Sequence, residues 1–232
     1  MSRSVTRTAA VLLALGALAY TAWVLEVLVR TGLDPVRTYV SELAAADQPL
    51  GGLFRATDLA AGALVLAGAV VGAWGTLTST SRPTRDPWEA VGWVALAVFG
   101  AATVADSRLP LSCAPTVDPE CAARETAGLV PATHTAHAVS SSFAMTGALV
   151  ALVALTVAAR RHGRRPALAR TGPALVVLEF AATAWTLTAV AAFEAGKGTW
   201  SLGAGQRLQV LLVAVWLAVL AYSLAREKEE ER

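Results

Sequence analysis

The chain has 232 residues, of which 55% are apolar and 16% charged, and its mean hydropathy is +0.54. Soluble domains carry about 25% charged residues, so this composition is typical of a membrane protein and excludes both an ordinary soluble fold and a disordered chain. The formal net charge of +2 is too small to indicate nucleic-acid binding, and no basic-aromatic pattern accompanies it.

Six apolar segments separated by short polar loops dominate the sequence. They lie at about residues 9–29, 53–75, 88–106, 134–159, 172–195 and 206–225. A helix needs about 20 mostly apolar residues to cross a bilayer, and in hydrocarbon it must satisfy its own backbone hydrogen bonds. The sequence therefore predicts an all-α fold in which one membrane domain of six transmembrane helices ends in a charged tail at 226–232.

The distribution of the 19 Lys and Arg residues predicts the orientation in the membrane. Twelve of them flank the ends of the spans that share a side with both termini: Arg3, Arg7, Arg82, Arg85, Arg160, Arg161, Arg164, Arg165, Arg170, Arg226, Lys228 and Arg232. The other flanks hold seven. By the positive-inside rule both termini are expected in the cytoplasm of a plasma-membrane protein. The first apolar run continues to Val29, past the core of about 7–15 residues that a cleaved signal has, so it is expected to remain as an anchor.

Cys113 and Cys121 both lie in the loop between spans three and four, on the predicted outer side, where disulfides persist. Closing this nine-residue loop would stabilise the fold by about 2.6 kcal/mol in the chain-entropy model. A shared metal ion is the alternative, but seven intervening residues exceed the usual spacing of zinc thiolates. A disulfide is the better interpretation.

Ionisable side chains within the spans gather toward the predicted outer ends. They are Glu26, Arg55, Asp58, Asp106, Arg108, His134, His137, Glu194 and Arg207. Such groups are costly in a membrane and usually pair or line a cavity. The sequence thus predicts a polar pocket at the outer leaflet, built from the ends of spans one to four. Glu179 is the mid-membrane exception and shares a helical face with Thr183 and Thr186.

The start of span four carries the candidate catalytic and metal-binding residues. His134, His137 and Ser141 recur at i, i+3 and i+7, which places them on one helix face. Neutral imidazole binds metals or accepts a proton, and Asp106 or Asp58 could add a carboxylate ligand for zinc. Hydrogen bonds that only orient the helices are the structural alternative.

Arg55 and Asp58 lie three residues apart, so they could form an internal ion pair. Alternatively Arg55, together with Arg108 or Arg207, could accept the anionic head group of a membrane lipid. In that interpretation Glu42, Arg55, Asp58, Arg108 and Ser141 form the ligand-binding set.

The loop after span one has apolar residues at Val36, Tyr39, Val40 and Leu43. This spacing predicts a short amphipathic helix that lies on the outer interface. It could cover the polar pocket or merely cover the helix ends.

One stretch of the chain resembles the Ser-acidic-Leu signature of a bacterial multi-spanning family, domain of unknown function 998. It consists of Tyr39-Val40-Ser41-Glu42-Leu43, followed by Pro49 and by Leu53-Phe54-Arg55 at the start of span two. Asp106 and Pro110 after span three, and a histidine that opens span four, are similar to that family as well. The resemblance covers about residues 9–225 and implies a fold but no activity; the paired cysteines are not part of it.

A looser similarity links the chain to the membrane hydrolases that include alkaline ceramidases and progestin-receptor-like proteins. Those proteins use Ser, Asp and three His around zinc, and Ser41 or Ser141, Asp106, His134 and His137 are similar to that set. No histidine follows His162, so the family's later His-x-x-x-His helix has no counterpart in this chain.

These residues support two functional hypotheses. In the first, the protein is not an enzyme: its outer pocket binds a lipid or another amphiphile, or docks a membrane-protein partner in the cell envelope. In the second, His134, His137 and Asp106 hold a metal that activates water, or Ser41 takes part, in hydrolysis of a lipid ester or amide. A small-molecule transporter is a third possibility, although no inverted repeat is evident.

Overall fold

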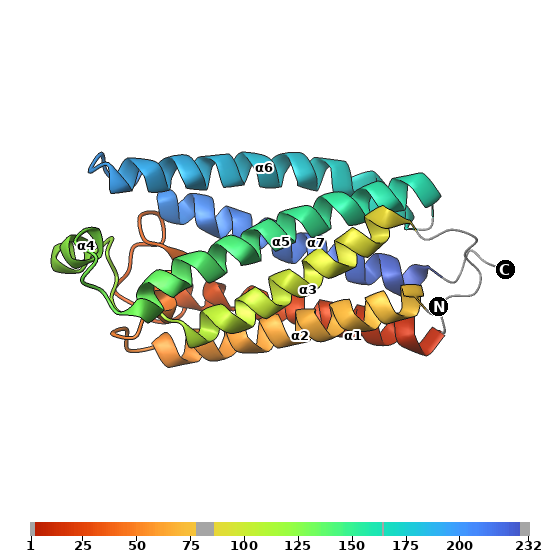
Figure 1. Ribbon diagram of the computed structural model, residues 1–232, viewed down its shortest axis with the longest axis horizontal. Coiled ribbons are helices and arrows are strands. Elements are labelled where there is room, and N and C mark those ends of the chain that lie inside the picture. The colour runs from red at the N-terminus through yellow and green to blue at the C-terminus, as the bar shows by residue number, and fades with distance from the viewer. Residues whose placement is uncertain (1–2, 78–85, 164, 228–232) are drawn as a thin grey trace.

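The computed structural model describes residues 3–77, 86–163 and 165–227, and these ranges fold into one elongated helical bundle (Figure 1). Its long helices are α1 (Arg3–Tyr20), α2 (Gly51–Leu77), α3 (Pro87–Arg108), α5 (Ala132–His162), α6 (Pro166–Glu194) and α7 (Leu202–Arg226). The short helix α4 (Pro119–Thr126) and the 3-10 helices η1 (Ala22–Val27) and η2 (Val40–Ala44) complete the fold. The six long helices are apolar and long enough to cross a membrane, which confirms the predicted fold class.

Most helices extend beyond the predicted apolar runs. Helix α6 begins at Pro166 rather than near 172, because a helix continues into the polar interface where its flanking side chains are solvated. The first span instead changes geometry: α1 ends at Tyr20, where the backbone N–H and the hydroxyl of Thr21 both donate to the carbonyl of Leu18, and η1 continues the crossing. Residues 228–232 of the predicted tail, and Arg82, Arg85 and Arg164 of the basic loops, lie outside the described ranges.

Close glycine contacts bring α2, α3 and α5 together. A Cβ atom added to Gly62 of α2 would lie 2.8 Å from the carbonyl oxygen of Gly100 in α3. One added to Gly147 of α5 would lie 2.8 Å from the backbone nitrogen of Phe99. Only residues without a side chain permit these approaches. The three helices therefore hold their ends, which carry polar residues, close to one another.

We call the end of the bundle that carries η2, α4 and the loop 109–131 the disulfide end. It lies opposite the start of α1 and the end of α7 (Figure 1). Cys113 and Cys121 are bonded, which confirms the predicted disulfide. Tyr39, Ser41 and Glu42, which are discussed below, also lie at this end.

The outer amphipathic helix predicted near residues 34–43 is shorter than expected. Only Val40–Ala44 is helical, as the 3-10 helix η2, and Val36 is 48% exposed. Leu43 and Ala44 instead pack against Phe54 of α2. The apolar face of this segment turns into the bundle because Glu42 beside it is fully buried and bonded to the disulfide loop.

A buried ion pair ties the first span to the last at the disulfide end. Arg207 of α7 donates from Nε and Nη2 to the two carboxylate oxygens of Glu26 in η1, both at 2.6 Å. Its Nη1 donates to the carbonyl of Thr38 at 2.8 Å and to that of Gly203 at 3.2 Å. One guanidinium therefore connects η1, the loop before η2 and the first turn of α7.

The sidedness that the basic residues predict can be tested on the disulfide. In right-side-out membrane vesicles, an impermeant maleimide should label Cys113 and Cys121 only after treatment with an impermeant reductant. Labelling without reduction would contradict the disulfide in the membrane. A requirement for permeabilisation would place the disulfide end in the cytoplasm.

Breaking the Glu26–Arg207 pair should destabilise the bundle strongly. Removing one partner of a buried pair costs about 3–5 kcal/mol, because the other charge stays buried without compensation. We expect Glu26→Met to lower the thermal unfolding midpoint in detergent and the double variant Glu26→Met/Arg207→Met to recover more than half of the loss. Arg108→Met, which alters an exposed arginine at the same end, is the control. Equal midpoints for Glu26→Met and this control would refute the prediction.

Candidate functional site

A cavity of about 130 Å³ lies inside the disulfide end, between α1, α2, α3, α5, α7 and η2. Its polar lining consists of Tyr20, Ser41, Asp58, Thr103, Asp106, His137, Ser141, Gln206 and Gln209. The polar pocket that the sequence predicted near this end is therefore present, although α7 also contributes to it.

The carboxylate of Asp106, at the end of α3, lies against the first turns of α5. Ser140 and Ser141 each donate a hydroxyl hydrogen bond to it, from Oγ of Ser140 to Oδ1 and from Oγ of Ser141 to Oδ2, the latter at 2.8 Å. Nδ1 of His137 lies 3.5 Å from Oδ1. The Gly147 contact holds α3 and α5 close enough for these bonds to form.

The hydrogen bonds of His137 fix its tautomer when the ring is neutral. Its Nδ1 lies 3.0 Å from the carbonyl oxygen of Leu109, which can only accept, so Nδ1 carries the proton. The free lone pair of Nε2 then faces Oγ of Ser141 at 3.3 Å. The cavity thus places a proton acceptor beside a hydroxyl group.

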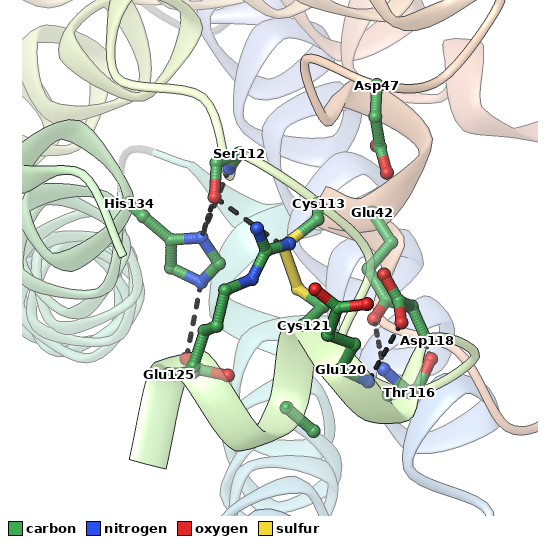
Figure 2. Close-up of a disulfide and its surroundings, with 12 residues drawn as sticks. Glu42, Asp47, Ser112, Cys113, Thr116, Asp118, Glu120, Cys121, Glu125 and His134 are labelled. Atoms are coloured by element: carbon green, nitrogen blue, oxygen red, sulfur yellow. Dashed lines mark hydrogen bonds and ion pairs between the residues drawn. A yellow bond between two sulfur atoms is a disulfide. The ribbon is translucent and has the colours of Figure 1, made fainter. Parts of the chain in front are cut away.

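His134 does not join this group. The backbone N–H of Ser112 donates to its Nδ1 at 3.1 Å, and its Nε2 lies 3.3 Å from the carboxylate of Glu125 in α4 (Figure 2). His134 lies nearly one helical turn before His137, and its ring contacts the disulfide loop and α4 instead of the cavity. His134, His137 and Asp106, the candidate metal ligands, are therefore not gathered, and the described residues hold no group of three His, Cys, Asp or Glu suited to a metal ion.

Glu42 closes the disulfide end above the cavity without lining it. Its carboxylate accepts from the backbone N–H of Thr116 at 2.8 Å, from the hydroxyl of Thr116 and from the N–H of Tyr39 at 3.0 Å (Figure 2). Burial raises the pKa of Glu42, and these hydrogen bonds offset part of that effect. Burial also raises the pKa of the neighbouring Tyr39 phenol. Glu42 therefore joins the disulfide loop to η2.

The remaining candidates occupy different positions. Ser41 and Asp58 line the cavity, whereas Arg55 and Arg108 do not. Nη1 of Arg55 donates to the carbonyls of Ala44 and Ala45, at 2.7 and 3.2 Å, and so holds η2 against α2. The Arg55–Asp58 ion pair is not formed, and within the described ranges Asp58 makes no hydrogen bond or ion pair.

A second, larger space of about 430 Å³ opens between α5 and α6. Ala138, Ser142 and Leu149 line it from α5, and Thr183, Leu187 and Val190 line it from α6. Ser41, His137, Ser141, Met145, Gln206 and Gln209 line both spaces. The polar cavity is thus adjacent to a mostly apolar opening in the side of the bundle, which we call the α5–α6 opening.

Sequence reasoning missed Tyr20, Gln206 and Gln209 as lining residues. The two glutamines recur at i and i+3 in an apolar span, which is a signal for a shared polar face that could have been used. Tyr20 gave no such signal, since a tyrosine near a span end is equally typical of an interface anchor.

These helices and this cavity define a multi-pass membrane protein with six spans and a polar cavity near one end. Residues 13–223 match the family described as "Protein of unknown function (DUF998)". The chain belongs to that family, as the Ser-acidic-Leu segment and the polar span ends predicted. No curated protein and no solved structure matches the chain.

Proposed function

We propose that the protein binds an amphiphile from the outer leaflet of the plasma membrane. The head group occupies the polar cavity, and the apolar chain occupies the α5–α6 opening. The adjacency of these two spaces, which share six lining residues, is the observation that carries the proposal. Ligand sites that combine an apolar wall with a few convergent polar groups are typical of specific binding.

The surroundings of the opening support entry from the membrane rather than from water. Val139 and Phe143 of α5 and Leu187 of α6 are 55%, 60% and 63% exposed. Such large apolar side chains face lipid at low cost but face water at high cost. The charge distribution supports an outer-leaflet position for this end, so the protein would act as an envelope accessory protein that holds a membrane lipid or presents it to a partner.

The lining also changes the expected head group. Within the part of the chain that the structure describes, no Lys or Arg lines the cavity, and Arg55 is occupied by backbone carbonyls. The sequence-based expectation that Arg55 and Arg108 meet an anionic head group is therefore not favoured. The available groups are carboxylates, hydroxyls and amides, which suit a head group that donates hydrogen bonds.

A bulky side chain in the α5–α6 opening should prevent binding. We expect Ala138→Trp to reduce the amount of co-purified amphiphile, measured by native mass spectrometry after gentle extraction, about tenfold or more relative to wild type, because the indole fills the space for the apolar chain. Val139→Trp is the matched control, since Val139 is exposed on the same helix but does not line the opening.

Equal retention in both variants would contradict access through this opening. Absence of any retained amphiphile from wild-type protein, both after extraction and after addition of a lipid extract, would contradict the proposed function itself.

Hydrolysis of a lipid ester or amide is the second candidate, and the contact of Ser141 with His137 favours it. The Ser141 hydroxyl would first turn its hydrogen from Asp106 to Nε2 of His137. Oγ would then attack the carbonyl carbon while Nε2 takes the proton and returns it to the leaving group, and water would hydrolyse the resulting acyl-enzyme. Asp106 beside Nδ1 would stabilise the imidazolium. In this arrangement the chemistry rests on Ser141 instead of on a metal held by His134 and His137.

A fluorophosphonate probe with an alkyl chain tests this candidate. If Ser141 is an activated nucleophile, the probe should add covalently to the wild-type protein and to Ser142→Ala, but not to Ser141→Ala or His137→Asn. Peptide mass mapping locates the adduct. Failure to label wild-type protein in detergent and in liposomes would remove the hydrolase hypothesis.

A further inference from the structure

We infer that the head group taken into the cavity is an ammonium group, so that the ligand is a cationic amphiphile. This inference rests on the proposed amphiphile site and specifies its ligand. It follows from the charges, the aromatic side chains and the size of the cavity.

Acidic groups outnumber basic ones in the cavity lining. Asp58 from α2 and Asp106 from α3 face the cavity, and among the described residues His137, beside Asp106, is the only lining group that can become positive. Asp106 is bonded to Ser140 and Ser141, but Asp58 has no partner among the described residues. A carboxylate at this depth in an apolar bundle is costly unless a cation or several hydrogen-bond donors compensate it.

A third acidic side chain, Glu179 of α6, is 1% exposed but does not line the cavity. Asp58 and Asp106 therefore place carboxylates from two helices on the cavity wall, and a bound cation would lower the free energy of both.

Aromatic rings form much of the remaining wall. Tyr20, Trp23 and Phe54 line the cavity, and Tyr20 is held in place by an edge-to-face contact with Phe99 at 5.3 Å between ring centroids. The faces of aromatic rings attract cations, and cages of such rings recognise quaternary ammonium groups. Carboxylates together with aromatic rings favour an organic cation over a neutral or anionic head group.

The size of the cavity and its ligand groups do not favour a single water or a zinc ion as the occupant. A single water needs about 10–15 Å³ by the same measure, and the cavity holds about 130 Å³. It therefore accommodates a group much larger than one water. A metal ion would require at least three closely grouped ligands, and the described residues do not provide such a group.

The test compares three amphiphiles that share one hexadecyl chain and differ in the head group. Purified full-length protein in a neutral maltoside detergent is titrated with hexadecyltrimethylammonium, with hexadecyl phosphate and with the glycerol ether of hexadecanol. The readouts are retention in native mass spectrometry and the shift of the thermal unfolding midpoint, which rises for a ligand that binds the folded state. We expect the trimethylammonium compound to bind at least about tenfold more tightly than the other two.

Variants locate the binding. Asp58→Asn removes one charge at nearly constant shape and should weaken binding of the trimethylammonium compound about tenfold. Because it removes an uncompensated charge, it should not lower the midpoint in the absence of ligand. Trp23→Leu should weaken binding several-fold through the lost ring face. Val139→Ala, which alters an exposed side chain that lines neither space, is the control and should bind as wild type does.

The outcomes separate this inference from the proposed function. If all three amphiphiles bind equally and Ala138→Trp still prevents binding, the amphiphile site stands and the preference for a cation is wrong. If none binds, both are wrong. If tetramethylammonium alone binds as tightly as the hexadecyl compound, the cavity takes a soluble organic cation, and the amphiphile assignment is overturned.

Discussion

The buried pair of Glu26 and Arg207 is the interaction on which the disulfide end depends. Two ions removed from water in an apolar bundle are tolerated only if each satisfies the other and the remaining donors find acceptors. Arg207 meets this condition with both carboxylate oxygens of Glu26 and with two backbone carbonyls. The pair thereby fixes where η1, the loop before η2 and α7 meet, and these elements form one side of the cavity. Arg207, which the sequence offered as a candidate for ligand binding, therefore has a structural role.

At the disulfide end, some helices pack closely while others leave a space between them. Glycines let α2, α3 and α5 approach closely, and this approach aligns Asp58, Asp106 and His137 along one wall. Between α5 and α6 the side chains leave a space that lies beside this wall and opens toward the lipid. Glu42, bonded to Tyr39 and Thr116, covers the wall from the other direction through η2 and the disulfide loop. A site with this shape is reached from the side, which is why we propose an amphiphile and not a freely soluble ligand.

The sequence predicted where in the bundle the candidate site lies, but only some of the residues that line it. Charged residues in apolar spans are expensive, so their crowding near one end indicated a shared polar region, and Asp58, Asp106, His137 and Ser141 do line one cavity. Helical spacing alone could not separate His134 from His137, because both lie near the start of the same helix and the neighbours of each come from other segments. Arg55 was predicted to bind a ligand because its partners in the fold could not be foreseen. They are the carbonyls of Ala44 and Ala45, and local sequence does not show that this segment packs against α2.

The sequence by itself determined that the chain is a six-span helical membrane protein with a disulfide loop. Hydrocarbon forces apolar segments of this length into helices, and two cysteines eight positions apart can close a short loop. Family membership followed from the order of a few polar residues along the chain. Which charges pair and which stay unpaired was decided only by the tertiary structure. Pairing depends on the rotation and separation of helices far apart in sequence, as Glu26 and Arg207 show, and a carboxylate such as Asp58 is left to face a cavity only when packing gives it no partner.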